Sequence, residues 1–489
     1  MTVELRPLGV TCNIRCSYCY QNPQRDAGNF GRRYDLEAMK ATVAEIGGPF
    51  TLFGGEPLLV PLEDLEELWS WGFETYGASS LQTNGTLITD EHLRLFRRYA
   101  VKVGISVDGP EDLNVERRAG SDRQTAERTR ATHRAIARLC EEGTPPGIIV
   151  TLHRTNAAAD RLARMSEWFR HLDAIGVRRV RLHVLEWEES TPDPELMLTP
   201  EENAAALLHF ARLEPQLAHL RFDLLTEMRA MLLARDGEAS CVWHACDPYT
   251  TAAVQGVEGR GQSSNCGRTN KDGVDFVKAA TVGHERQVSL YHTPQEHLGC
   301  QGCRFFLVCK GNCPGTASDT DWRNRSEHCA LWMRLFEHLE AELVAEGRVP
   351  LSLHPLREAV ERELVALWAE GGDEPLASVL QRLERDGAPG APPAAAGAHP
   401  VAGRLLPAFC RVSWVGDRAR EVWRPRLDAV RRAWRQVEAR SVAEGLRAAA
   451  VLDVPPDELA ELAERVGEWG LTAFALGVAL PAADGGGGG

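Results

Sequence analysis

The sequence predicts an α/β protein: an open or closed (β/α) barrel of six units, followed by a small cysteine-rich domain and a mainly helical C-terminal extension. Short β-rich runs alternate with stretches of helical periodicity from residue 2 to about residue 185. The units follow one another at intervals of roughly 25 to 45 residues, and strands joined by helical crossovers form parallel sheets. After residue 241 the composition changes to cysteine, glycine and polar residues with little periodicity, which is typical of a small domain held by metal sites.

The barrel prediction is based on six predicted strands and on the helix that connects the first two. The predicted strands are residues 3–10, 49–53, 79–84, 101–107, 147–152 and 177–185. The first crossover helix is predicted from Leu36 to Ile46, where apolar residues recur at helical spacing, with Asp35 as the N-cap and Gly47 as the stop. In this architecture functional groups gather at the C-terminal ends of the strands.

Changes of composition divide the chain into seven segments. We expect a barrel at residues 1–190, a helical bridge at 191–240, the cysteine-rich domain at 241–335, a helical extension at 336–385, a linker of Pro, Ala and Gly at 386–403, a helical C-terminal unit at 404–484 and a disordered glycine tail at 485–489. The linker has little to bury, so the unit after it is expected to be separate.

Length, charge and cysteine content narrow the class of protein. A chain of 489 residues with 44% hydrophobic residues can bury a large core, and about 150 residues per domain indicates roughly three domains. The net charge of -14 gives no broad attraction to nucleic acid or anionic lipid, and no run approaches the roughly 20 apolar residues of a membrane span. The first ten residues do not resemble a secretory signal. We therefore expect a cytoplasmic protein with no nucleic-acid or membrane partner, in which 13 cysteines indicate metal ligation or catalysis.

Three cysteines follow the first predicted strand in the stretch TCNIRCSYCY, residues 11–20. Cys12, Cys16 and Cys19 are separated by three and then by two residues. A structural zinc site takes four ligands, and no Cys or His close after Cys19 supplies the fourth. Three cysteine ligands on a four-iron cluster instead leave one iron open to a small molecule. The group therefore indicates a cluster with a free coordination position.

This motif, with Tyr18 just before its last cysteine, resembles that of the radical S-adenosylmethionine (SAM) superfamily. The resemblance implies a partial (β/α)6 TIM-like barrel, a 4Fe-4S cluster on the three cysteines, and SAM bound at the open iron. Cleavage of SAM would then supply a radical that removes hydrogen from an unactivated carbon, so that the cofactors carry the bond chemistry and the protein positions the groups.

The same resemblance implies SAM contacts at the ends of the next three strands. In FGGEP, Glu56 would bind the methionine amino group beside bare glycine backbone, and in ISVDG, Ser106 and Asp108 would lie near the ribose or carboxylate. An arginine that pairs with the SAM carboxylate is expected at Arg118 in preference to Arg117. Asn-Gly and Asp-Gly pairs also occur in ordinary turns. The order of these motifs at successive strand ends nevertheless favours the resemblance. The implied cofactor contacts are Tyr18, Gly54, Gly55, Glu56, Asn84 of LQTNG, Ser106, Asp108 and Arg118.

The second cysteine group resembles a SPASM domain, which carries two auxiliary 4Fe-4S clusters. Cys246, Gly261 and Cys266 are followed by a C-x2-C-x5-C-x3-C run from Cys300 to Cys313 and by one further cysteine. A zinc ribbon would explain only the run. The resemblance assigns Cys246, Cys266 and Cys313 to the first auxiliary cluster, and Cys300, Cys303, Cys309 and Cys329 to the second.

Seven thiolates do not fill the eight positions of two clusters. Either Cys241 is the eighth ligand, or one iron of the first auxiliary cluster is open to a substrate. Cys140 and Cys410 are expected to be ordinary buried cysteines. With three clusters in all, the protein is expected to contain ~12 iron atoms.

Radical SAM proteins with a SPASM domain mostly modify peptides. The resemblance implies an oxidoreductase that abstracts hydrogen from a residue of a ribosomally made precursor peptide and forms an intramolecular cross-link, thioether or carbon-carbon. Other side-chain oxidation or epimerisation is the alternative, including sulfatase maturation, in which an aspartate base typically follows the second SPASM cysteine; Gly267 stands there. A non-catalytic iron-sulfur electron carrier is an alternative of another class. No catalytic residue is assigned, although His183 and Glu186 lie near the sixth strand.

The implied partners are the precursor peptide and an electron donor such as flavodoxin or ferredoxin. Peptide-modifying relatives often carry a leader-binding unit before the barrel, whereas the first strand here starts at once. Leader recognition is therefore expected from the C-terminal unit or from a separate leader-binding protein.

Overall fold

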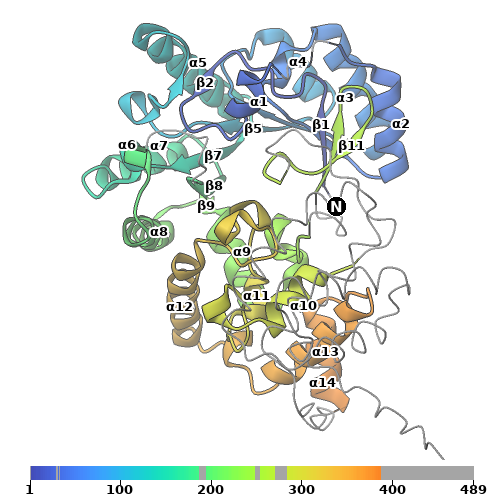
Figure 1. The fold of residues 1–489 in the computed structure, drawn as a ribbon. Coiled ribbons are helices and arrows are strands. Elements are labelled where there is room, and N and C mark those ends of the chain that lie inside the picture. Colours follow the sequence, from blue (N-terminus) through green and yellow to red (C-terminus); the bar gives the residue numbers. More distant parts are fainter. Residues whose placement is uncertain are drawn as a thin grey trace, which may run out of the picture.

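The computed structural model describes residues 2–28, 31, 33–186, 194–247, 254–269 and 283–386. The predicted linker after its first residue, the C-terminal unit at 404–484, the glycine tail at 485–489 and Cys410 lie outside the described residues. Figure 1 shows two parts, a sheet covered by helices and, beside it, a set of shorter helices and turns.

A nine-stranded sheet forms the first part of the molecule (Figure 1). Its strands lie in the order β11-β10-β1-β3-β4-β5-β7-β8-β9, and all neighbours pair in parallel except β10 and β11. Six of them correspond to the predicted strands: β1 (Thr2–Arg6), β3 (Phe50–Leu52), β4 (Ser80–Thr83), β5 (Lys102–Ser106), β7 (Gly147–Leu152) and β8 (Arg179–Val184). The structure confirms the predicted α/β class, with a mainly parallel sheet and helical crossovers.

Three further strands extend this sheet at its edges. β9 (Arg221–Phe222) lies beside β8, β10 (Val254–Glu258) pairs with β1, and β11 (Ser263–Ser264) pairs with β10. The last two belong to the region predicted as the cysteine-rich domain. Part of this region therefore belongs to the barrel sheet. The sequence analysis did not predict this, because the pairing joins Thr2 to Val254, which are far apart in the sequence.

Helices follow the strands and cover the outer face of the sheet. α2 (Leu36–Ile46) confirms the first predicted crossover helix: the Asp35 side chain accepts from the backbone N–H of Ala38, and Gly47 ends the helix with a φ of 76°. The other helices of this part are α1 (Asn22–Asp26), α3 (Leu62–Tyr76), α4 (Asp90–Arg98), α5 (Asp122–Glu141), α6 (Arg154–Ala157), α7 (Leu162–Ala174) and α8 (Pro200–Leu213). A two-stranded ribbon of β2 (Arg15–Cys16) and β6 (Arg117–Arg118) lies beside the sheet.

The two faces of the sheet differ in polarity. Side chains toward the helices are apolar and fully buried, among them Val3, Leu5, Leu52, Ile105, Val150 and Val180. The alternating strand positions carry half-buried polar side chains, among them Glu4, Gln82, Ser106, Thr151 and His183. Successive side chains of a strand point to opposite faces, so these polar groups share the inner face of the barrel. A ligand in the barrel would therefore meet polar groups.

The cysteine-rich region consists of short helices and turns. α9 (Asp223–Leu232) precedes this region, in the predicted helical bridge. The region itself contains α10 (Glu285–His292), α11 (Phe306–Cys309) and the start of α12 (Cys329–Ala345), and α13 (Arg357–Ala369) and α14 (Leu376–Asp386) follow as a helical extension. None of the helices in the described ranges combines the length and the apolar character that crossing a bilayer requires.

One buried arginine supports the turn between α11 and the next cysteine. Residues 310–312 all adopt positive φ, so their carbonyls are outside any helical ladder. Arg286 on α10 is 1% exposed. Its guanidinium donates to the carbonyls of Gly311 at 3.1 Å, Asn312 at 2.9 Å, Trp322 at 2.7 Å and Asn324 at 2.9 Å. One side chain thus satisfies several buried carbonyls of an irregular segment.

Replacing Arg286 by methionine should leave these carbonyls without donors. Each buried unsatisfied group costs about 1–3 kcal/mol, so we expect the free energy of unfolding to fall by at least about 3 kcal/mol, with loss of soluble protein. Arg286→Lys should be intermediate, because an ammonium group has three donors and no planar fork. The measurement is chemical denaturation, with Arg334→Met on the exposed surface of α12 as the control. Equal stability of Arg286→Met and the wild type would contradict this role.

Candidate functional site

The loop after β1 brings the three cysteines of the first group together. Cys16 lies on β2, and the N–H of Cys19 donates to the carbonyl of Cys16 at 3.2 Å. Burial raises the pKa of the Cys16 thiol to about 12; Arg117 opposes this rise, and the neighbouring Cys19 and Cys12 add to it. Cys12 and Cys19 thus lie close to the buried Cys16 thiol, and the three thiols fit three ligands of a cluster.

Two side chains direct N–H groups at these thiols. Arg25 Nη2 lies 3.4 Å from Cys19 Sγ, and Asn84 Nδ2 lies 3.8 Å from Cys12 Sγ. Hydrogen bonds to sulfur favour the thiolate, which is the form that binds metal. Asn84 was predicted from the LQTNG stretch. Arg25 on α1 was missed, because nothing in the surrounding sequence distinguishes it from a solvated arginine.

The two glycines before Glu56 pack against the cysteine loop. A Cβ on Gly54 would lie 2.5 Å from the carbonyl oxygen of Gly9, and a Cβ on Gly55 would lie 2.0 Å from that of Thr11. The N–H groups of Gly55 and Glu56 donate to the same two carbonyls at 2.8 Å. Only glycine fits there, so the pair holds the end of β3 against the loop that carries the first cysteine.

Glu56 connects the end of β3 to the end of β4. Its side chain is buried and accepts from the N–H of Leu58 at 3.0 Å, the hydroxyl of Thr83 at 2.7 Å and the N–H of Asn84 at 2.8 Å. Burial raises the pKa of Glu56, and these hydrogen bonds oppose the rise. A carboxylate offers about four acceptor positions. One position therefore remains for a ligand donor such as an ammonium group.

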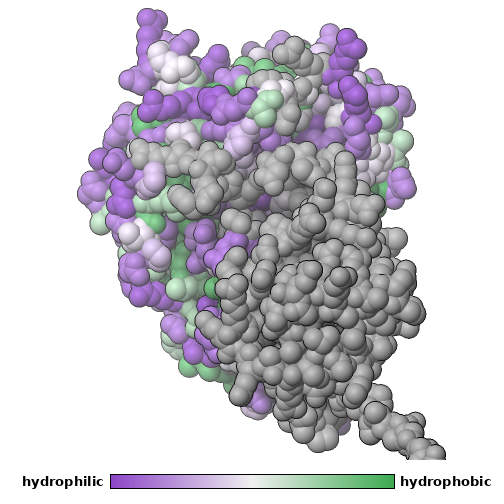
Figure 2. Space-filling model, viewed as in Figure 1, coloured by the Kyte–Doolittle hydropathy of each residue, from purple (hydrophilic) through white to green (hydrophobic). Residues whose placement is uncertain are grey.

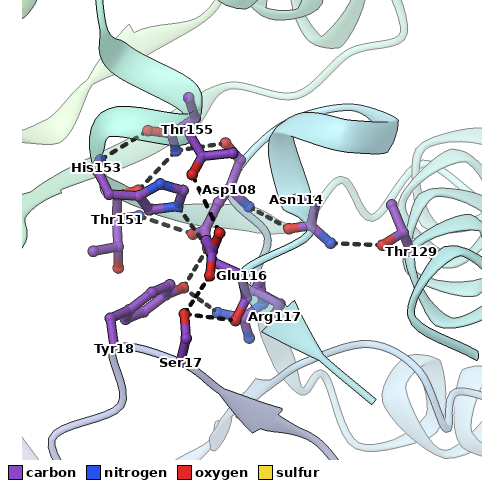
Figure 3. A network of polar contacts seen from close by, with 11 residues as sticks. Ser17, Tyr18, Asp108, Asn114, Glu116, Arg117, Thr129, Thr151, His153 and Thr155 are labelled. Carbon is purple, nitrogen blue, oxygen red and sulfur yellow. Dashed lines mark hydrogen bonds and ion pairs between the residues drawn. The ribbon is translucent and has the colours of Figure 1, made fainter. Parts of the chain in front are cut away.

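Tyr18 and Asp108 meet in a buried polar network (Figure 3). The Tyr18 hydroxyl donates to Asp108, and Arg117 Nη1 donates to the Tyr18 hydroxyl at 3.1 Å. Asp108 also accepts from the N–H of Thr151 at 3.0 Å, and His153 Nε2 lies 3.6 Å from it. Burial opposes ionisation of Asp108, but the neighbouring His153 and the charge of Arg117 hold its pKa below the usual value. The sequence analysis predicted Asp108 near the ribose or carboxylate of SAM; in the structure its enclosed carboxylate accepts from Tyr18 and from the N–H of Thr151.

The structure separates the two arginines that the sequence analysis considered together. Along β6, Arg117 points inward beside Cys16 and Tyr18, whereas Arg118 is exposed. Arg117 is thus the residue that reaches the interior, although the sequence analysis preferred Arg118. Ser106 lies on the inner face of β5, where its hydroxyl accepts from Gln82 Nε2 at 2.9 Å.

Cys241 lies with the three cysteines expected at the first auxiliary cluster. Burial raises the pKa of the Cys241 thiol to about 12, and Cys313 and Cys266 add to the rise. Burial also raises the pKa of Cys246, with contributions from Cys266, Cys241 and Cys313. The four thiols therefore lie near one another. Four such thiols fit the four ligands of one cluster.

The other four cysteines line a second cavity, of about 360 Å³. The wall includes Cys300, Cys303, Cys309 and Cys329, together with Phe305, Phe306, Trp332, Met333 and Phe336. Burial raises the pKa of these thiols, and neighbouring thiols add to the rise for Cys300, Cys303 and Cys309. Four thiols among aromatic side chains fit a buried cluster. In the described ranges, no three His, Cys, Asp or Glu side chains are arranged as ligands of a single metal ion.

A larger cavity, of about 620 Å³, lies between β8 and the first auxiliary group. Arg181, His183, Glu186, Cys241 and Arg268 are on its wall. Arg268 Nε lies 2.8 Å from Glu186, and its Nη2 lies 3.0 Å from His183 Nδ1. Burial lowers the pKa of His183 well below its usual value, and the charges of Arg268 and Arg181 lower it further. His183 is therefore a neutral imidazole that accepts from Arg268.

Glu4 is a carboxylate that the sequence analysis missed. It lies on the inner face of β1, where burial raises its pKa and the backbone N–H of Gly267 donates to it. Its Oε2 is buried without a hydrogen-bond partner. A Cβ on Gly267 would lie 2.7 Å from the Tyr20 hydroxyl, so the loop after Cys19 contacts the loop after Cys266. The signal in the sequence that could have revealed Glu4 was an acidic residue inside an otherwise buried strand.

Comparisons with known proteins agree with this geometry. Residues 7–165 match the family model of the Radical SAM superfamily. The serine-type anaerobic sulfatase-maturating enzyme of Klebsiella aerogenes is 25% identical over 374 residues, which are 70% of this chain and 85% of that enzyme. The cysteine-type enzyme of Clostridium perfringens is 33% identical over 129 residues, 23% of this chain and 34% of that enzyme. This chain thus spans about a third of the length of the second relative.

A solved structure shares the fold. Native anSMEcpe with bound AdoMet superposes with a TM-score of 0.56 and 19% identity, over 71% of this chain and 98% of that one. At this identity the likeness concerns the fold alone, a mainly parallel α/β sheet with helical crossovers followed by a cysteine-rich region.

Replacing Cys241 by alanine should remove about one cluster from protein reconstituted without oxygen, that is about four of ~12 iron atoms. The reason is the loss of one of four neighbouring thiols. Iron analysis and electron paramagnetic resonance measure the change. Cys140→Ala, at a half-buried position on α5, is the matched control and should retain all iron. Unchanged iron and spectra in Cys241→Ala would instead indicate an open iron in the first auxiliary cluster.

Proposed function

We propose that this chain, which carries a radical SAM domain at residues 7–165, is an enzyme that removes hydrogen from a residue of a peptide substrate and oxidises that residue by two electrons. One observation carries the proposal: Tyr20, next to Cys19, contacts Gly267, next to Cys266. A substrate at the C-terminal ends of the strands would lie between the group that starts the reaction and a group that can accept a second electron. Simple return of hydrogen to the substrate needs no such neighbour.

The residues fit three 4Fe-4S clusters and SAM. When bound, the first cluster and SAM supply the abstraction of hydrogen from an unactivated carbon. Cys12, Cys16 and Cys19 would hold that cluster, and the N–H groups of Arg25 and Asn84 would stabilise their thiolates. Two sets of four thiols would hold the auxiliary clusters: Cys241, Cys246, Cys266 and Cys313, and Cys300, Cys303, Cys309 and Cys329.

Three residues would orient SAM. Glu56 has one acceptor position left, which suits the ammonium group. Arg117 points inward beside Tyr18 and suits the carboxylate, in place of Arg118. Asp108 would keep Arg117 and Tyr18 in place without touching the ligand.

Cross-linking of a precursor peptide is the first candidate reaction. With Cys241 among four thiols, the first auxiliary cluster would have no iron open to a substrate thiol. A thioether formed through such an iron is therefore disfavoured. Closure of a carbon-carbon or carbon-oxygen bond fits better, because the fully ligated cluster would only accept an electron.

Sulfatase-type maturation is the second candidate, favoured by the similarity to sulfatase-maturating enzymes over most of the described chain. Oxidation of a serine side chain to an aldehyde removes two hydrogens and needs a group that takes the proton of the hydroxyl. Gly267 has no side chain to do this, and Tyr20 occupies the adjoining space. Glu4 is the carboxylate bound to the Gly267 backbone, and its free oxygen Oε2 can take that part.

The enzyme, SAM and a reductant should convert a substrate peptide to a product lighter by two hydrogens, with one deoxyadenosine formed for each modification. Deuterium at the attacked carbon should appear in the deoxyadenosine, as measured by mass spectrometry. A product that reacts with a hydrazide is an aldehyde and favours the sulfatase-type reaction; an unreactive product of the same mass is a cross-link.

Two results would contradict the oxidation. A product of unchanged mass that takes up solvent deuterium would show epimerisation. Absence of deoxyadenosine from fully reconstituted protein would show an electron carrier without SAM chemistry.

Replacing Glu4 by glutamine should lower the yield of oxidised product by about a hundredfold or more, because the proton acceptor is lost, while SAM cleavage without product formation continues. The ratio of deoxyadenosine to product, measured by chromatography, should therefore rise. Glu63→Gln, an exposed carboxylate on α3, is the control and should leave the ratio unchanged. An unchanged ratio in Glu4→Gln would remove Glu4 from the reaction.

A further inference from the structure

We propose that the ion pair of Arg268 and Glu186 sets the reduction potential of the first auxiliary cluster, with Arg268 raising the potential and Glu186 lowering it. The pair would thereby adjust this cluster to accept the second electron of the oxidation. The inference deepens the proposed function and rests on it, because only a residue that is oxidised by two electrons needs such an acceptor.

Arg268 lies between the first auxiliary group and the cavity beside it. It follows Cys266 by two residues, and it shares the wall of the 620 Å³ cavity with Cys241 and Cys313. Cys246 and Cys266 are not on this wall. The cavity therefore adjoins the thiols on the side of Cys241 and Cys313, and the guanidinium of Arg268 stands at the same boundary.

Two contacts fix the guanidinium in this place. Arg268 Nε lies 2.8 Å from Glu186, and Nη2 lies 3.0 Å from His183 Nδ1. Because the guanidinium is a planar fork, contacts on two of its nitrogens fix its orientation. Among the described residues Nη1 has no partner, and the side chain is 29% exposed on the cavity wall. The positive charge is thus held at one position beside the thiols and is not enclosed by the protein.

The charge of Arg268 acts on the first auxiliary thiols. Burial and the neighbouring Cys313 and Cys266 raise the pKa of Cys241, whereas the charges of Arg268 and Arg181 oppose the rise. A positive charge that favours a thiolate also favours the extra electron of a reduced cluster, since each adds negative charge at the same place. Removal of this charge should therefore make the cluster harder to reduce.

The second cation on the cavity wall, Arg181, is offset within the protein framework. Its partner Glu227 lies 2.5 Å from Arg181 Nη2 and also accepts from the Ser240 hydroxyl at 2.7 Å and from Trp243 Nε1 at 2.8 Å. These bonds connect β8 to α9 and to the segment before Cys241. Arg181 therefore belongs to a structural network, whereas the loop after Cys266 carries Arg268 to the thiols.

The second auxiliary set has a cation of its own. Arg325 is on the wall of the 360 Å³ cavity with Cys300 and Cys329, and it donates to the carbonyl of Gly299 at 2.9 Å. Arg268 is not on that wall. A substitution of Arg268 should thus change the potential of the first auxiliary cluster and leave that of the second nearly unchanged.

In the proposed oxidation the substrate radical gives one electron to the first auxiliary cluster. The cluster is reduced by one electron, and the attacked residue loses one proton to a nearby acceptor such as Glu4. With the hydrogen already removed by the first radical, the residue has then lost two electrons and two protons. A cation beside both the cavity and the thiols favours this transfer.

The test is a potentiometric titration of the full-length, reconstituted protein without SAM or peptide, followed by electron paramagnetic resonance. The step that disappears in Cys246→Ala belongs to the first auxiliary cluster. Arg268→Gln should lower the midpoint of this step by at least about 59 mV, a tenfold change in the equilibrium constant of a one-electron reduction. Glu186→Gln should raise it by a similar amount, because the charge of Arg268 is then unopposed. Arg268→Lys keeps the charge and should restore most of the potential.

Arg98 and Glu66 provide a matched control pair. They lie 3.1 Å apart on α4 and α3, on the outside of the sheet. Figure 2 shows hydrophilic residues, in purple, at the upper right, where Figure 1 places these helices. Arg98→Gln and Glu66→Gln make the same changes of charge at this surface and should leave all midpoints unchanged.

The opposite signs separate an electrostatic role from a structural one. An unchanged midpoint in both Arg268→Gln and Glu186→Gln, or a shift of the same sign in both, would overturn the inference. So would an equal shift of all steps, or the absence of any step that Cys246→Ala removes. If Arg268→Gln loses iron, Glu186→Gln decides alone: a raised midpoint supports the pair, and any other result refutes it.

Formation of deoxyadenosine with a chemical reductant and SAM tests the proposed function separately. Its absence from the wild type would refute that function, while the midpoints still decide whether the pair sets the potential.

Discussion

The pairing of β1 with β10 is the interaction on which the candidate site depends. The two strands pair in parallel from Thr2 with Val254 to Arg6 with Glu258. Arg6, which is 5% exposed, reinforces the pairing: it lies 2.9 Å from Glu258 and donates to the hydroxyl of Ser264 at 2.6 Å. The strand that leads into the first cysteine loop is thereby tied to the hairpin that leads to Cys266. Without this pairing the first cysteine group and the first auxiliary group would not face the same space.

Outside the sheet, buried arginines satisfy backbone carbonyls that have no partner in a regular hydrogen-bond ladder. A segment rich in turns leaves backbone carbonyls without partners, and burial of an unpaired carbonyl is costly. Arg286 satisfies several of them around residues 310–312, and Arg25 donates to the carbonyl of Val10 at 2.7 Å in the first cysteine loop. The segments that carry cysteines thus have an internal framework. This framework places Cys309 and Cys313 in different groups although only three residues separate them.

The site combines rigid positioning with a limited number of free polar groups. The carboxylates of Glu56 and Asp108 accept most of their hydrogen bonds from groups of the protein itself. These hydrogen bonds fix the strand ends to one another. Glu4 Oε2 remains without a partner among the described residues. His183 is occupied by Arg268 and stays neutral. Chemistry that depends on cofactors needs this arrangement, because the protein contributes by placing groups and excluding water.

The sequence by itself determined the fold class and grouped most of the cysteines. Hydrophobic periodicity and the spacing of residues within one loop are local properties, so the six strands, the helix from Leu36 to Ile46, and the sets around Cys12 and Cys300 could be predicted. Only the tertiary structure decided the rest. Cys241 lies near Cys266 and Cys313, which are distant from it in sequence. Arg117 and Arg118 point to opposite sides because β6 pairs with β2, about a hundred residues earlier, and Glu4 meets Gly267 across the β1–β10 edge. Each of these contacts depends on strand register between remote segments, and register is set by the packing of the whole sheet.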